Sequence, residues 1–107
     1  MNIPEKFECA GFVINVKIVD KLSNNGYGLY CDATNTITIA KTVDVPDIGI
    51  VNLTEQQLFN TFAHELIHVW QFYYNNEYSE SQAQVFANFI CEFFKTISDE
   101  TDYFKKR

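Results

Sequence analysis

The spacing of apolar residues changes once along this chain, close to Thr54. Before that point apolar and polar side chains alternate, most clearly from Phe12 to Val19, which is the period of a strand with one buried face. After it, apolar side chains recur every three or four positions, which is the period of an amphipathic helix. Strands followed by helices, without alternation of the two, predict an α+β fold. A length of 107 residues fits one domain, spanning residues 1–107.

Turn-forming residues divide the first half into short strands. Asn and Gly dominate positions 23–26, and a second polar turn covers 32–35. Turns of this length join neighbouring strands, so we predict an N-terminal antiparallel β-meander of three to four strands. Pro46 and Gly49 interrupt the stretch from Thr42 to Leu53, which we interpret as a loop. The expected strands cover residues 7–10, 12–19, 27–32 and 36–39.

Two capping motifs mark the starts of two helices. Thr54 is followed three residues later by Gln57, a pattern in which each side chain bonds the other residue's backbone N–H. The same pattern recurs at Ser79 and Gln82. We therefore expect one helix from 55 to about 74 and a second from 80 to about 97. Two helices joined by so short a turn form an αα-hairpin.

The charge balance restricts the partners of this chain. It holds 8 Lys plus Arg against 14 Asp plus Glu, a net charge of −6. Nucleic acids and anionic membranes attract basic surfaces, so we expect neither as a partner. No apolar run reaches the ~18 residues of a transmembrane helix, and Met1–Glu8 lacks the apolar segment of a signal peptide. Cys9, Cys31 and Cys91 are too far apart for a metal motif and predict buried, reduced thiols, which favours a cytoplasmic protein.

Both histidines of the chain lie in one five-residue motif, His64-Glu65-Leu66-Ile67-His68. On a helix, positions i and i+4 lie one turn apart on the same face, so both imidazoles can bind one metal ion. Glu65 lies about 100° further round the helix and can reach a water molecule on that metal. The metal makes such a water more acidic, and the carboxylate can act as general base in its attack on a carbonyl.

The surface of the expected helix supports a metal site. His64 and His68 share their side of the helix with polar residues, while large apolar residues cover the other side. The histidines should therefore face a cleft or solvent, and the apolar side should pack on the core. The polar residues of this stripe are Gln57, Asn60, Thr61 and Gln71.

A catalytic zinc ion usually has three protein ligands, so the two histidines are not enough. The chain has no third histidine, and the third ligand must be a carboxylate downstream of His68. Glu80 and Glu77 are the two main alternatives. If the first helix runs to 74, Glu80 has to reach back along it, unless that helix ends early or the second helix crosses it at an angle. The remaining downstream carboxylates are Glu92, Asp99, Glu100 and Asp102.

Glu80 begins the pattern Glu80-x-x-Ala83-x-x-Phe86-Ala87. An HExxH helix followed by a helix with this pattern resembles the ImmA/IrrE-type metallopeptidases, a gluzincin group common in phage and mobile elements. The run Asn35–Lys41, ahead of the HExxH helix, is also similar to small phage-encoded zincin-like proteins. The likeness covers residues 27–94. Ile67 departs from it, since the family usually has glycine before the second histidine.

The resemblance implies a single minimal zincin-like metallopeptidase domain of the gluzincin type. His64, His68 and Glu80 would bind Zn²⁺. Glu65 would be the catalytic base, activating the zinc-bound water for hydrolysis of a peptide bond in a protein or peptide substrate. By analogy, Thr36–Ala40 would be an edge strand that holds the substrate by β-augmentation.

Two other functions are compatible with the same residues. One is a catalytically weak or inactive zincin-like module that binds a metal or a protein. The other is an interaction domain in which HExxH is incidental. A tyrosine hydroxyl is a plausible donor to the transition state of a peptidase, but the sequence does not rank the candidates. They are Tyr27, Tyr30, Tyr73, Tyr74, Tyr78 and Tyr103.

Overall fold

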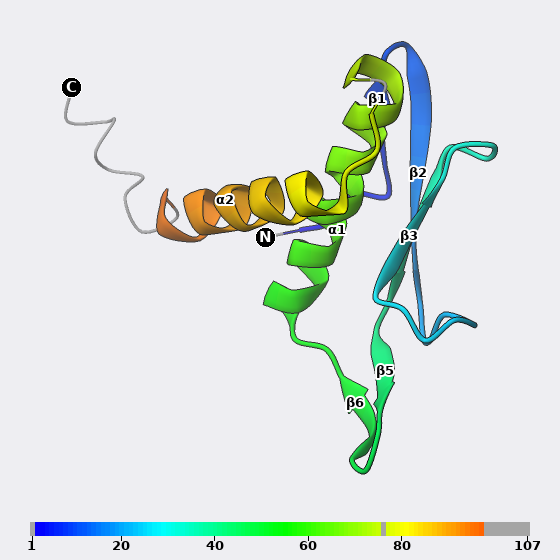
Figure 1. The fold of residues 1–107 in the computed structure, drawn as a ribbon, viewed down its shortest axis with the longest axis vertical. Helices are drawn as coiled ribbons and strands as arrows, with labels where there is room; N and C mark the ends of the chain where they lie inside the picture. Colours follow the sequence, from blue (N-terminus) through cyan, green and yellow to red (C-terminus); the bar gives the residue numbers. More distant parts are fainter. Residues whose placement is uncertain (1, 76, 98–107) are drawn as a thin grey trace.

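The computed structural model describes residues 2–75 and 77–97. In this part of the chain it shows six strands in two sheets and two α-helices, which confirms the α+β class (Figure 1). None of the helices described there is long and apolar enough to cross a membrane. Four candidate residues, Asp99, Glu100, Asp102 and Tyr103, lie outside the described residues.

The main sheet has four strands, and its order along the sheet is β1-β2-β4-β3. The strands are β1 (Lys6–Cys9), β2 (Phe12–Val19), β3 (Gly28–Cys31) and β4 (Thr36–Ala40). The predicted antiparallel meander is wrong, because β2 and β4 pair in parallel and β3 lies outside β4 at the edge. The inner strands are β2 and β4, and burial on both faces is typical of strands in parallel pairs. In β4, Ile37, Ile39 and Ala40 are fully buried.

A separate hairpin follows the main sheet. It consists of β5 (Thr42–Val45) and β6 (Gly49–Asn52), so the predicted loop from Thr42 to Leu53 is wrong. Pro46 lies in the turn of this hairpin, and Gly49, with a φ of +99° that favours glycine, begins β6. Figure 1 shows the hairpin projecting beyond the main sheet. Lys21 contacts Asp44 at 2.5 Å and ties the hairpin to the segment after β2.

The first helix, α1 (Glu55–Trp70), begins with the predicted capping box: Gln57 N–H donates to the Thr54 hydroxyl at 3.1 Å, and Thr54 N–H donates to the Gln57 amide oxygen at 2.7 Å. It does not continue as an α-helix to 74, because a π-helical turn, η1 (Gln71–Asn75), replaces its last predicted turn. The second helix, α2 (Glu80–Ile97), has the predicted bounds. Figure 1 shows α2 crossing α1 rather than running back alongside it.

The core lies between the sheet and α1. Ile14, Ile37 and Ile39 from the sheet are fully buried against Phe62 and Val69 of α1. A second, smaller contact joins the two helices, where Ala83, Ala87 and Cys91 of α2 are buried and Ala87 and Cys91 pack with Ala63 of α1. Small side chains at this crossing allow the helices to approach closely, which brings the start of α2 to the histidine face of α1.

The three cysteines are free thiols. Cys91 is buried as predicted, whereas Cys9 and Cys31 are partly exposed. Both lie at ends of short strands near the margin of the sheet, where the burial is incomplete.

Gly28 marks the closest approach of β3 to α1. A Cβ atom at this position would lie 2.5 Å from Thr61 Cγ2 and 3.3 Å from Glu65 Cγ. We expect Gly28→Ala to lower the free energy of unfolding by about 1–3 kcal/mol, measured by urea denaturation, because overpacking forces the strand away from the helix. Thr61→Ser removes the clashing methyl group and keeps the hydroxyl that donates to Gln57 O at 3.0 Å. The double variant should therefore regain most of the loss, and strictly additive effects would contradict the steric explanation.

Candidate metal centre

The two histidines lie one turn apart on α1, and their Nε2 atoms are 3.2 Å from one another. His68 is 6% exposed, and the His64 side chain is 16% exposed. His68 lines a cavity of about 390 Å³ beside β3, and His64 lines a second hollow of about 370 Å³. The predicted polar stripe thus faces a cleft, as expected, although α2 covers part of it.

Glu80, the first residue of α2, completes the group. Its Oε1 atom contacts His68 Nε2 and lies 3.2 Å from His64 Nε2. Among the described residues, these three side chains are the one group of His, Cys, Asp or Glu with donor atoms close enough for a shared metal ion, all within 4.8 Å of one another. Glu80 reaches the histidines because α2 crosses α1 at an angle, which is one of the conditions set by the sequence, while the helical path after α1 continues through η1 to Asn75.

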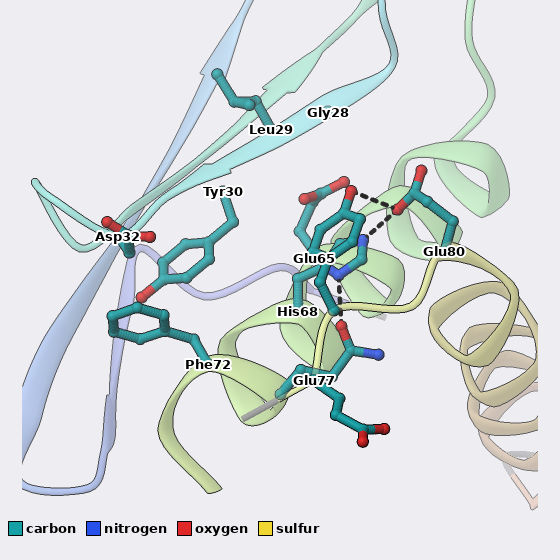
Figure 2. A pocket seen from close by; sticks show the side chains of 11 residues that line it. Gly28, Leu29, Tyr30, Asp32, Glu65, His68, Phe72, Glu77 and Glu80 are labelled. Atoms are coloured by element: carbon teal, nitrogen blue, oxygen red, sulfur yellow. Dashed lines mark hydrogen bonds and ion pairs between the residues drawn. The ribbon is translucent and has the colours of Figure 1, made fainter. Parts of the chain in front are cut away.

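Glu77, the predicted alternative ligand, does not join this group. It lines the same 390 Å³ cavity, but Figure 2 shows its carboxylate directed away from His68 and Glu80. Glu92 lies three turns further along α2 and is also outside the group.

Two of the three donor separations fit the size of a zinc ion, whereas His68 Nε2 and Glu80 Oε1 lie closer together than two ligands of one zinc ion. Ligands at 2.0–2.1 Å in a tetrahedron lie about 3.3 Å apart. The separation between the two imidazole nitrogens and that between His64 and the carboxylate are both 3.2 Å. Two imidazole nitrogens and one carboxylate oxygen are also a donor set that zinc prefers.

Two glutamine side chains fix which nitrogen of each imidazole faces the centre. The amide nitrogen of Gln71 donates to Ser79 O at 3.0 Å and to Gln82 Oε1 at 2.7 Å, so its Oε1 is the atom that faces His68 Nδ1 at 2.8 Å. An amide oxygen only accepts, and Nδ1 must therefore carry the proton. The Nε2 lone pair of His68 is then free and points at Glu80.

His64 is held in the same way. Its Nδ1 lies 2.9 Å from Gln84 Oε1, while the Gln84 amide nitrogen donates to Asn88 at 2.8 Å. Asn60 of α1 also donates to the Asn88 amide oxygen, at 3.2 Å, so the network links both helices. Metal-binding histidines commonly donate their second ring N–H to such a partner.

Gln71 lay on the predicted polar stripe, but its role did not follow from the sequence, and Gln84 was missed. The signal for Gln84 is its spacing: it lies four residues after Glu80 and hence on the same side of α2. The orientation of the Gln71 amide depends on Ser79 and Gln82 near the start of α2, contacts that the sequence did not indicate.

Tyr78 lies directly over the centre. Its ring stacks on the His68 imidazole with centroids 4.5 Å apart and planes 3° apart, and its hydroxyl donates to Glu80 Oε1 at 2.9 Å. Burial raises the pKa of Tyr78, and the Glu80 carboxylate raises it further. The hydroxyls of Tyr30 and Tyr73 instead donate to Asn35 Oδ1. Among the tyrosines that the structure describes, Tyr78 is therefore the one whose hydroxyl bonds a candidate metal ligand.

The two glutamates of the centre differ in their surroundings. Glu65 is 8% exposed, and burial raises its pKa, although the imidazoles of His68 and His64 oppose this effect. For Glu80, burial also acts to raise the pKa, but the hydrogen bond from Tyr78 and the contacts with the His64 and His68 imidazoles outweigh it, and the pKa is lowered. Glu80 is thus held as a carboxylate, while Glu65 lines both hollows without joining the donor group.

The strand predicted to hold an extended peptide, Thr36–Ala40, is not an edge strand. It is β4, and β2 and β3 pair with its two sides, so its backbone has no free edge. The edge strands of this sheet are β1 and β3, and Gly28, Leu29 and Tyr30 of β3 line the 390 Å³ cavity (Figure 2).

Gln71→Leu tests whether Gln71 orients His68. We expect the zinc dissociation constant to rise by about 10–100-fold, because the imidazole loses the partner that fixes its tautomer and ring orientation. Competition with a chromophoric zinc chelator measures the change. Gln84→Leu, which affects the more exposed His64, is the matched variant and should weaken binding less. An unchanged dissociation constant in Gln71→Leu would rule out this positioning role.

Comparison of the chain with protein-family models, with curated proteins and with solved structures found no match. The likeness to the ImmA/IrrE-type metallopeptidases therefore remains a prediction from the motif residues. A function for this chain has to be inferred from the geometry of the centre.

Proposed function

We propose that this chain is a minimal zinc-dependent peptidase of the gluzincin type, with a zincin-like fold related to the ImmA/IrrE-type metallopeptidases. One observation carries the proposal. The Nε2 atoms of His64 and His68 and the carboxylate of Glu80 lie close together around one position. The other ring nitrogen of each histidine, Nδ1, bonds to a glutamine oxygen. Three electron-rich atoms so close together repel one another unless a metal cation or a shared proton lies between them, and a bound zinc ion would satisfy all three at once.

The number of ligands favours a catalytic ion over a structural one. Structural zinc sites close the tetrahedron with four protein ligands, whereas catalytic sites use three and keep one position open. A zinc ion bound by His64, His68 and Glu80 would supply Lewis-acid activation of water and of a carbonyl group. Glu65 lies at the same cleft and is placed to accept a proton from the attacking water at its carboxylate and to return it to the leaving amine nitrogen.

The cleft suits an extended polypeptide. The two hollows share Gly28, Glu65 and Glu80 among their lining residues, so together they form a continuous depression across the centre. The edge strand β3 borders this depression and would pair with a peptide through its outward backbone groups, of which the Tyr30 N–H bonds the Glu65 carboxylate. We therefore transfer the expected β-augmentation from β4 to β3, and take a peptide or protein as the substrate.

The proposal is tested by zinc content and cleavage on the same sample. Purified protein is stripped with a chelator, reloaded with one equivalent of zinc, and incubated in both forms with a mixed peptide library that is read by mass spectrometry. We expect one zinc ion per chain and new peptide termini with the reloaded form alone. A wild-type protein that takes up no stoichiometric zinc would overturn the proposal.

A further inference from the structure

The 390 Å³ cavity extends away from the metal ligands along the sheet. Figure 2 shows the Tyr30 ring between Asp32 at one end and Glu65, His68 and Glu80 at the other, with the Phe72 ring below Asp32. The two rings meet edge to face, with centroids 6.3 Å apart and planes at 70°. The volume lies in the range of about 300–1,000 Å³ that is usual for ligand sites. The cavity is thus an aromatic-walled groove that leads from the candidate catalytic centre to a carboxylate.

Apart from His68, the charged side chains that line this groove are all carboxylates. Asp32 and Glu77 are exposed carboxylates at its rim, and no Lys or Arg of the described part of the chain lines it. Within residues 2–75 and 77–97, neither carboxylate has an ion-pair partner. The Tyr30 hydroxyl does not compensate Asp32, because it donates to Asn35. The net charge of −6 adds to the negative potential.

We propose that this groove selects a long cationic side chain, arginine or lysine, next to the bond that is cleaved. The aliphatic stem would lie against Tyr30 and Phe72, and the cationic head would reach Asp32, with Glu77 contributing to the field. Arginine suits this site best, since its guanidinium stacks on aromatic faces and pairs with carboxylates through two hydrogen bonds. An acidic side chain would be repelled. The inference rests on the proposed function only in taking the ligand to be a polypeptide that crosses the centre.

The test measures binding, so that it does not depend on turnover. Isothermal titration calorimetry compares two short peptides with uncharged flanking residues and blocked ends, one with a central arginine and one with citrulline, its neutral isostere. The full chain is used in zinc-loaded and chelator-treated forms. We expect the arginine peptide to bind about tenfold more tightly, from one cation–π contact at a partly exposed site and one exposed ion pair.

Two variants locate the effect. Asp32→Asn should lower the affinity for the arginine peptide by about fivefold, the value of one exposed ion pair, and leave the citrulline peptide unchanged. Asp47→Asn, at the tip of the β5–β6 hairpin, removes the same charge away from the groove and should change neither. Equal affinity for the two peptides, or an equal effect of the two variants, would overturn the inference. The zinc content of the same samples tests the proposed function separately, because the preference for arginine does not require the metal.

Discussion

His68→Ala is expected to abolish high-affinity zinc binding. Structural zinc sites release about 10–16 kcal/mol on binding over four ligands, so one ligand contributes roughly 3–4 kcal/mol, or about 100–1,000-fold in affinity. The effect should lie at the upper end of this range, because His68 is the more buried histidine and the closer one to Glu80. The variant also leaves the Gln71 amide oxygen without its partner. Chelator competition and metal analysis of the dialysed protein measure the loss.

The two candidate carboxylates supply the matched pair for this measurement. Glu80→Ala should lose zinc as His68→Ala does, whereas Glu77→Ala should bind zinc as wild type does, since its carboxylate is directed away from the centre. Gln56→Ala, at an exposed position on α1, controls for a substitution in the same helix. Loss of zinc in Glu77→Ala but not in Glu80→Ala would reverse the assignment of the third ligand.

The parts of the molecule that the sequence predicted depend on local geometry. Thr54 and Gln57 lie within one turn, and their mutual hydrogen bonds set the start of α1 without help from the rest of the fold. The spacing of His64 and His68 likewise places both imidazoles on one face of any α-helix. Glu80 was predicted from its motif, and the structure places it with both histidines.

The sheet could not be predicted in the same way, because its order depends on contacts between distant residues. The turns near 23–26 and 32–35 were correctly recognised as chain reversals. The connection through the first turn, however, places β3 at the edge of the sheet and leaves the position next to β2 for β4. Burial of Ile37 and Ile39 against α1 decides that β4 is central. This pairing also determines which strand borders the cleft, so the error in sheet order moved the expected peptide site to the wrong strand.

The hydrogen bonds from the histidines to Gln71 and Gln84 could not be predicted from the sequence either. Gln71 lies three residues after His68 on the same face of α1, but the bonds that turn its amide oxygen toward the imidazole come from the segment at the start of α2, and Gln84 reaches His64 only because α2 crosses α1. The crossing in turn depends on buried alanines, Ala83 and Ala87, which allow the helices to come close. The ligands could therefore be predicted from spacing, but the residues that orient them required the tertiary structure.

Glu65→Gln separates the two functions that share this metal centre. The substitution keeps the size of a side chain that is 8% exposed and lies close to Gly28, and it removes the proton acceptor. We expect cleavage to fall by about 10²–10⁴-fold, the usual contribution of a general base. Zinc binding should stay close to that of wild type, because Glu65 is outside the donor group. Initial rates on the best library peptide, with zinc content determined on the same samples, measure both.

The outcomes of this experiment lead to different conclusions about the centre. Asp47→Asn is the control for a carboxylate-to-amide change outside the cleft and should cleave at the wild-type rate. If Glu65→Gln keeps wild-type activity, another group accepts the proton and the assignment of Glu65 is wrong. If wild type binds one zinc ion tightly but cuts no peptide, the metal-binding module without catalysis is the better description. The open cleft at the edge of β3 would then serve to hold a polypeptide rather than to hydrolyse it, and the arginine preference of the groove would persist in both cases.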